Sequence, residues 1–174
     1  MSPAGVVPVA VERYRRLMGA FPTGVAVLTA VDGAGRPHGL TCTSLTSVTT
    51  CPPTLAVSLA ETSGTLAAIR HSRAFGLNLL RARARQVAQV FAGRMPDRFA
   101  RVAWCASPSG HPWLRQDAFA CADCVVVDST LIGDHAVLFA RIVQVEQAAG
   151  VPLLRGLRQF RAWPVEPTTL AVAQ

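Results

Sequence analysis

The chain has 174 residues, a length that suits one domain with a substantial buried core. Hydrophobic residues make up 51% of it, and no apolar run approaches the roughly 20 residues that span a bilayer, which predicts a globular protein outside the membrane. The net charge is +7 and all 17 basic residues are arginine, but they are scattered among few aromatic residues (6%), a pattern that disfavours a nucleic-acid-binding groove.

The first ten residues lack the basic head of a signal peptide, and we expect residues 1–10 to form a flexible tail on a cytoplasmic protein. We expect the domain to occupy residues 11–165 and a second tail to follow at residues 166–174. The domain opens with apolar residues at a helical spacing, namely Val11, Tyr14, Leu17, Met18 and Phe21. This spacing predicts a helix that Pro22 ends.

Residues 25–31 are apolar and β-branched and predict a strand. The turn residues 32–35, Asp-Gly-Ala-Gly, return this strand as a hairpin. Their glycines do not form the G-x-G-x-x-G pattern that opens a helix, so a nicotinamide cofactor, if one is used, is not held on a Rossmann fold.

The segment at residues 41–53 reads Thr-Cys-Thr-Ser-Leu-Thr-Ser-Val-Thr-Thr-Cys-Pro-Pro. Its hydroxyl groups fall on both faces of the extended chain that it predicts, whereas an ordinary half-buried strand alternates apolar and polar residues. Buried hydroxyl groups cost free energy unless they are hydrogen-bonded. The segment is therefore either a solvent-facing edge or a place where hydroxyl and backbone groups meet a polar ligand.

Residues 55–59 predict a buried strand, and a short helix follows Ser63 and runs through Ile69. A hydroxyl before a helix caps it, and the same helix end also attracts an anion. Residues 74–80 predict another strand, in which Asn78 needs a hydrogen-bond partner: a backbone group and a ligand both remain open. The next helix is predicted at residues 81–91.

Two further strands are predicted at residues 125–131 and 136–145, joined by the turn Gly133-Asp134-His135. Cys121 and Cys124 come just before the first of them. Residues three apart on a strand face opposite sides, and no second cysteine pair is present, so we expect core cysteines and no metal site. Residues 153–163 close the domain.

The order of these motifs resembles the short-chain flavin reductase family, the NAD(P)H:flavin oxidoreductases with an FMN-binding split barrel. The resemblance runs from about Tyr14 to Trp163, and in the family residues 41–53 read roughly Thr-x-Asn-Ser-Phe-x-Ser-Val-Ser-x-x-Pro-Pro. Residues 74–80 and the Gly-Asp-His turn also match. This chain departs from the family at Thr43, Leu45, Thr49 and Gln159.

The resemblance implies a mainly β fold with flanking helices, in which a closed antiparallel Greek-key barrel of about six strands forms a homodimer. It implies an enzyme that transfers a hydride from NADH, or NADPH, to FMN or FAD. Such enzymes supply reduced flavin to a partner monooxygenase. The flavin itself carries the hydride chemistry, so the protein needs no covalent catalytic residue.

The resemblance also implies the site residues. The residues expected to bind the polar edge of the flavin ring are Thr41, Cys42, Thr43 and Ser44. Those expected to line the rest of the pocket are Ser47, Val48, Thr49, Ser58, Leu59 and Ala60. Ser63 and Thr65 correspond to the residues that hold the flavin phosphate. His135, with Asp134 beside it and together with Phe160, is expected to position the nicotinamide, and Asn78 is a candidate flavin contact.

Three alternatives stay open at this point. A flavoprotein oxidase with tightly bound FMN would share the fold, although the Gly-Asp-His turn argues against it. A flavin- or haem-binding protein without turnover would not oxidise NADH with any added flavin. A basic DNA-binding domain would show steeply salt-dependent binding.

Overall fold

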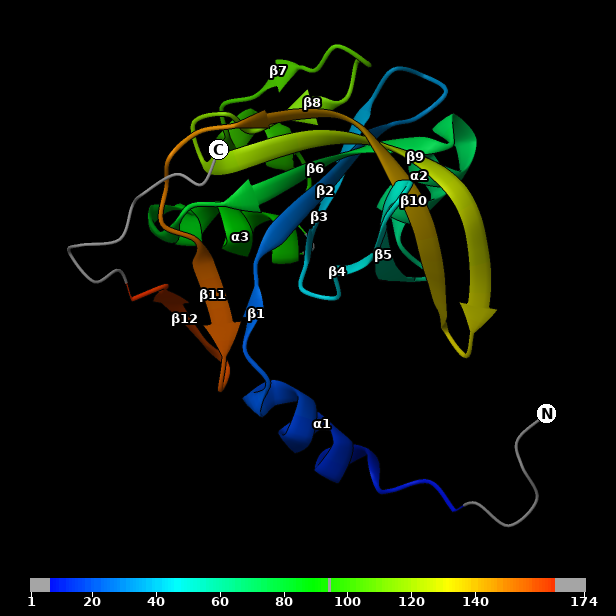
Figure 1. Cartoon of the computed structure of the whole chain (residues 1–174), viewed down its shortest axis with the longest axis vertical. Coiled ribbons are helices and arrows are strands. Elements are labelled where there is room, and N and C mark those ends of the chain that lie inside the picture. Colours follow the sequence, from blue (N-terminus) through cyan, green and yellow to red (C-terminus); the bar gives the residue numbers. More distant parts are fainter. Residues whose placement is uncertain (1–6, 94, 165–174) are drawn as a thin grey trace.

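The computed structural model describes residues 7–93 and 95–164 and is mainly β (Figure 1). The main sheet contains β2 (Ala26–Val31), β3 (Pro37–Cys42), β4 (Thr46–Thr50), β5 (Pro53–Ala60), β6 (Ala74–Leu80), β9 (Ala118–Ile132) and β10 (His135–Gln147). Two small sheets combine β1 (Thr23–Gly24), β11 (Leu153–Gly156) and β12 (Gln159–Ala162), and β7 (Cys105–Ala106) with β8 (Pro112–Trp113). The helices are α1 (Val11–Ala20), α2 (Gly64–Ser72), α3 (Arg85–Ala92) and the short turns η1 (Ala82–Ala84) and η2 (Arg98–Arg101).

The predicted elements are present at the expected places in the chain. The 41–53 segment does not form one continuous strand. It contributes the end of β3, an irregular link at residues 43–45 and the strand β4. Residues 1–6 and the predicted C-terminal tail at 166–174 lie outside the described residues. Among the described residues, no helix is long and apolar enough to cross a membrane.

The seven-stranded sheet has the order β3-β2-β6-β9-β10-β5-β4, and every neighbouring pair is antiparallel. Strands β3 and β4 are consecutive in the chain but lie at opposite edges of the sheet, and only residues 43–45 join them. No ladder pairs these two edges, so the sheet curves without closing. The sheet is antiparallel as expected, with seven strands where about six were expected, but the expected closure of the barrel is absent from the described sheet.

Strand β2 lies at the centre of the packing because it is buried on both faces. Leu28 belongs to the larger core cluster, which α2 covers with Leu66 and Ile69. Val27 points to the other face and packs with Phe91 of α3. Burial of a large apolar side chain stabilises the fold by about 1.5–3 kcal/mol, so these two clusters fix both helices against the sheet.

Helix α1 forms as its apolar spacing predicts, but none of its residues is buried. Tyr14, Leu17 and Met18 are exposed, and Figure 1 shows the helix standing away from the sheet. The apolar stripe that predicted this helix is therefore uncovered within the described part of one subunit.

A buried polar network ties the β7–β8 segment to the sheet. Asn78 of β6 is fully buried, and its Nδ2 donates to the carbonyl oxygens of Val27 (3.2 Å) and Pro112 (3.4 Å). Its Oδ1 accepts from the backbone N–H of Leu114 (2.7 Å) and from the thiol of Cys121 (3.4 Å). The amide of Asn78 thus has partners on the protein at both ends, which is the backbone alternative left open by the sequence.

The two cysteines of the C-x-x-C pair are buried in separate core clusters on β9, and neither forms a disulfide. Cys124 packs with the larger cluster, whereas Cys121 packs with Trp113. They face opposite sides of the strand, and the expectation of core cysteines is confirmed.

We predict that Asn78→Ala lowers the free energy of unfolding by roughly 2–4 kcal/mol, because it leaves the Leu114 N–H unpaired in the core and opens a small cavity. Urea denaturation measures this change. The exposed Gln116→Ala serves as control and should alter stability by no more than about 0.5 kcal/mol. A variant with native stability but weakened flavin binding would show instead that Asn78 serves the ligand.

Candidate functional site

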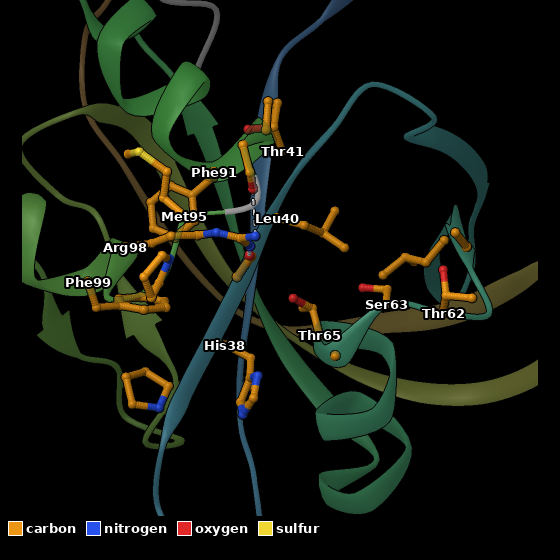
Figure 2. A pocket seen from close by; sticks show the side chains of 18 of the residues that line it. His38, Leu40, Thr41, Thr62, Ser63, Thr65, Phe91, Met95, Arg98 and Phe99 are labelled. Atoms are coloured by element: carbon orange, nitrogen blue, oxygen red, sulfur yellow. Dashed lines mark hydrogen bonds between the residues drawn. The ribbon is translucent and has the colours of Figure 1, made fainter.

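A cavity of about 1110 Å³ lies between β3, the end of β5, the start of α2 and the segment from the end of α3 to η2 (Figure 2). Strand β3 contributes its length from Pro37 to Thr41, and β5 contributes Ser58, Leu59 and Ala60. Ligand pockets usually measure about 300–1,000 Å³, so this cavity has room for a flavin and part of a second molecule.

The antiparallel pairing of β10 with β5 brings His135 to the cavity. His135 is in register with Ala60, and the backbone N–H of Glu61 donates to the carbonyl of Asp134 (2.9 Å). The His135 ring is exposed and lies 2.6 Å from a carboxylate oxygen of Asp134 through Nδ1. This hydrogen bond holds the pKa of Asp134 below its usual value, so the carboxylate orients the imidazole.

The N-terminus of α2 points at the same space. The Ser63 hydroxyl caps this helix by accepting from the Leu66 N–H (3.4 Å), as predicted, and Ser63, Gly64 and Thr65 line the cavity. The first N–H groups of a helix have no acceptor within the helix, and the positive end of its dipole favours an anion. Arg70 is neutralised by an ion pair with Glu61 and does not line the cavity.

The opposite wall packs closely against β3. A Cβ on Gly39 would lie 2.7 Å from the ring of Phe91 and 3.1 Å from that of Phe99, so only glycine allows this approach. Arg98 extends toward β3, as Figure 2 shows, and donates to the carbonyls of Gly39 and Gly93 (2.6 Å each). These contacts hold the η2 segment across the cavity.

His38 is a cavity residue with a fixed orientation. Its Nε2 lies 2.9 Å from Asp32 Oδ2, in the β2–β3 turn, and Asp32 also accepts from the backbone N–H groups of Ala34 and Arg36. The hydrogen bond to His38, followed by those of Arg36 and Ala34, keeps the pKa of Asp32 far below its usual value. The carboxylate therefore stays ionised and fixes the orientation of the His38 ring.

A second cavity of about 510 Å³ adjoins the first, and both are lined by Thr41, Ala92 and Gly93. The other lining residues of the second cavity are Thr43, Gln89, Arg155 and Phe160. It lies between α3 and the β11–β12 hairpin. These two elements pack together through Ala88 of α3, Leu153 of β11 and Phe160 of β12.

The structure brings together part of the predicted site. The main cavity is lined by Thr41, Ser58, Leu59, Ala60, Ser63, Thr65 and His135. Thr43 and Phe160 line the second cavity instead, so Phe160 and His135 do not share one cavity within the described subunit.

The remaining predicted residues lie outside both cavities. Ser47, Val48 and Thr49 are exposed on β4, the outer edge of the sheet, which agrees with the edge alternative for this segment. Asn78 is in the core and Asp134 is in the turn before β10. Ser44 has a structural role: its hydroxyl donates to the Ser58 carbonyl (2.9 Å) and accepts from the Ser58 N–H (3.0 Å), which fastens the 43–45 link to β5.

Several cavity residues were not assigned a role from the sequence, namely His38, Gly39, Leu40, Thr62, Phe91, Met95, Gln89 and Arg155. His38 and Gly39 immediately precede the 41–53 segment. Residues 96–99, Pro-Asp-Arg-Phe, resemble the Asp-x-Phe element of the family, which implied a place near the flavin or the dimer partner, and Arg98 and Phe99 line the main cavity. The signal for these positions was proximity to recognised motifs. Gln89 and Arg155 carried no signal of their own.

Cys42 is buried 3.3 Å from the Ser44 hydroxyl, and burial raises the pKa of its thiol, so the thiolate is scarce near neutral pH. We predict that Cys42→Ala keeps turnover within about tenfold of the native value, because the thiol fills core space and performs no redox step. Steady-state kinetics measures this. A larger loss at unchanged flavin affinity would contradict the packing role.

The comparisons with known proteins agree with this geometry. The flavin reductase like domain family matches residues 18–164. A relative from Lentzea aerocolonigenes, a flavin reductase (NADPH), is 53% identical over 154 residues, which cover 88% of this chain and 90% of the relative.

Two solved structures have a similar fold. An NADH:FAD oxidoreductase of Streptomyces globisporus C-1027, in complex with NAD and FAD fragments, has a TM-score of 0.82 and 27% identity, over 90% of this chain and 93% of that one. The styrene monooxygenase flavin reductase of Pseudomonas putida S12 has a TM-score of 0.80 and 29% identity, over 88% of this chain and 98% of that one. The chain therefore belongs to the flavin reductase-like domain family.

Proposed function

We propose that this chain is an NAD(P)H:flavin oxidoreductase that transfers a hydride from a reduced nicotinamide to FMN or FAD and delivers the reduced flavin to a partner monooxygenase. The observation that carries the proposal is the convergence of His135, the N-terminus of α2 and strand β3 on one cavity of about 1110 Å³. The relatives named as flavin reductases support the same activity.

The residues of the main cavity fit a flavin phosphate at one end and a ring at the other. Ser63, Thr65 and the free N–H groups of α2 suit the phosphate, because they offer donors at the positive end of a helix dipole. Leu40, Phe91 and Phe99 supply apolar surface for the ring, and Thr41 and Ser58 supply polar atoms at its edge. Of the predicted flavin residues, we keep in this site only those that line the two cavities.

A bound flavin accepts the hydride at N5, so the protein contributes mainly by positioning the two molecules. Positioning contributes on the order of 7–11 kcal/mol to catalysis when reacting groups are well aligned. We assign His135 to the nicotinamide, since its ring is oriented by Asp134 at the exposed mouth of the cavity. Arg98 and Phe99 restrict solvent access from the other side.

We further propose that the curved sheet is the split barrel of the family and that two copies of the chain associate. The exposed apolar residues of α1 (Val11, Tyr14, Leu17, Met18) and of the β9–β10 hairpin (Leu131, Ile132, Val143, Val145) support a homodimer, because large uncovered apolar faces favour association. Analytical ultracentrifugation tests this, and a monomer at micromolar concentration would exclude it. The five free cysteines support a reducing, cytoplasmic location.

The primary test is steady-state oxidation of NADH and of NADPH with added FMN, with added FAD and without flavin. Turnover that saturates with free flavin is expected for an enzyme that treats flavin as a substrate and passes it on. Turnover without added flavin would indicate a tightly bound prosthetic group, as in an oxidase. No turnover in any combination would refute the reductase function.

We predict that His135→Ala raises the KM for the nicotinamide nucleotide by about tenfold or more and leaves flavin affinity within about twofold, because the ring contacts the nucleotide alone. The control is His71→Ala, which removes an exposed histidine near the end of α2, outside both cavities. Unaltered nicotinamide kinetics would remove His135 from the site.

We also predict that Ser63→Ala weakens FMN binding by about tenfold and riboflavin binding by less than about twofold, because only FMN carries the phosphate. Fluorescence titration measures both affinities. Loss of the helix cap alone would cost about 1 kcal/mol of stability and would affect the two flavins equally. An equal effect would therefore assign Ser63 to the cap only.

A further inference from the structure

The second cavity contains positive charge without a counter-charge. The guanidinium carbon of Arg155 lies 5.0 Å from the centroid of the Phe160 ring, and that of Arg85 lies 5.8 Å from the same centroid. Arginine stays protonated at all physiological pH values. Arg155 itself lines the cavity, whereas Arg85 is exposed and reaches only the Phe160 ring of its wall.

No carboxylate among residues 7–93 and 95–164 offsets these charges. Among the described carboxylates, none lies within 4.0 Å of a nitrogen of Arg155 or Arg85. Other arginines do have carboxylate partners, as Arg36 has Asp32 and Arg70 has Glu61. Neither guanidinium donates a hydrogen bond to an acceptor within 3.5 Å on another described residue. Arg155 is half-buried, so its donors are held at the cavity and are only partly solvated.

The shape and lining of this cavity define the ligand class. A volume of about 510 Å³ suits a single nucleotide moiety and is too small for a nucleic-acid groove. Phe160 offers an apolar ring, Gln89 and Thr43 offer polar atoms, and a guanidinium is the preferred donor to phosphate. The shared residues Thr41, Ala92 and Gly93 place this cavity beside the proposed flavin cavity.

We propose that the second cavity holds the phosphate-bearing adenosine end of a nucleotide substrate, with Arg155 as its anion contact and Arg85 as a second charge. This inference rests on the proposed function for the identity of the substrates. Three of them carry this chemistry: NADPH, NADH and FAD all have a diphosphate joined to adenosine, and NADPH alone adds a 2′-phosphate. NADH lacks only the 2′-phosphate and FMN lacks adenosine, so comparing NADPH with NADH, and FAD with FMN, separates these sources.

The test uses Arg155→Gln, which keeps length and polarity but removes the charge, with Arg161→Gln as matched control. Arg161 lies one residue beyond Phe160 on β12, is exposed and lines neither cavity, so both variants lose one positive charge from the same hairpin. Calorimetry on the full chain measures binding of adenosine, ADP and 2′,5′-ADP without any turnover.

We expect Arg155→Gln to weaken a phosphate-bearing probe by about tenfold or more relative to adenosine, whereas Arg161→Gln changes it by less than about twofold. A loss confined to 2′,5′-ADP, together with a raised KM for NADPH but not NADH, identifies the NADPH phosphate. A loss for ADP, together with weaker binding of FAD but not FMN and an unchanged KM for NADH, identifies the FAD diphosphate. A loss for ADP with a raised KM for both NADH and NADPH identifies the diphosphate of the nicotinamide nucleotide. Arg155→Lys should restore part of the affinity, which separates charge from a folding defect.

Equal effects of Arg155→Gln and Arg161→Gln on every probe, or no binding of ADP and 2′,5′-ADP to the native chain, would overturn the inference. These results are distinguishable from failure of the proposed function. A chain that binds 2′,5′-ADP through Arg155 but oxidises no nicotinamide would retain the nucleotide site and lose the reductase assignment. If Arg155→Gln oxidises NADPH with an unchanged KM and binds FAD with unchanged affinity, the reductase assignment would stand and the nucleotide site at Arg155 would be refuted.

Discussion

The site depends on one short connection in the chain. Residues 43–45 join β3 and β4, which lie at opposite edges of a seven-stranded sheet. Such a sheet would be about 29 Å wide if flat, whereas a three-residue link extends only about 3.3–3.6 Å per residue. The sheet must therefore curl until its edges approach. The Ser44 hydroxyl fastens the link to Ser58 of β5, and β3 then faces β5 and α2 across the main cavity.

Close packing on the other side of β3 determines how open that cavity is. Gly39 lets the rings of Phe91 and Phe99 approach the strand, and Arg98 bonds to the carbonyls of Gly39 and Gly93. A side chain at position 39 would displace both rings, which explains on steric grounds why a glycine precedes the 41–53 segment. The wall formed in this way bounds the main cavity on one side and ends at Ala92 and Gly93, where the second cavity begins.

The sequence predicted the elements better than their assembly. Apolar spacing located α1, and turn residues located the β2–β3 hairpin, because both signals are local. Strand order and the open edge depend on contacts between distant residues, which no local pattern reports. Within the site, Ser63, Thr65 and His135 were implied by the family resemblance and line the main cavity, whereas Ser47, Val48 and Thr49, implied in the same way, are exposed on the edge strand β4 of the single chain. Arg155 was one arginine among 17, and only the fold distinguishes it.

The net charge of +7 is not spread evenly, because some arginines have carboxylate partners and others have none among the described residues. Glu61 neutralises Arg70 beside the main cavity and Asp32 neutralises Arg36, so these two arginines are offset by carboxylates. At the α2 N-terminus the positive potential comes from backbone N–H groups, and at Phe160 it comes from two arginines without a carboxylate partner among the described residues. Two separate anion sites at adjoining cavities suit a reaction between two phosphorylated molecules, whose rings must meet while their phosphates stay apart.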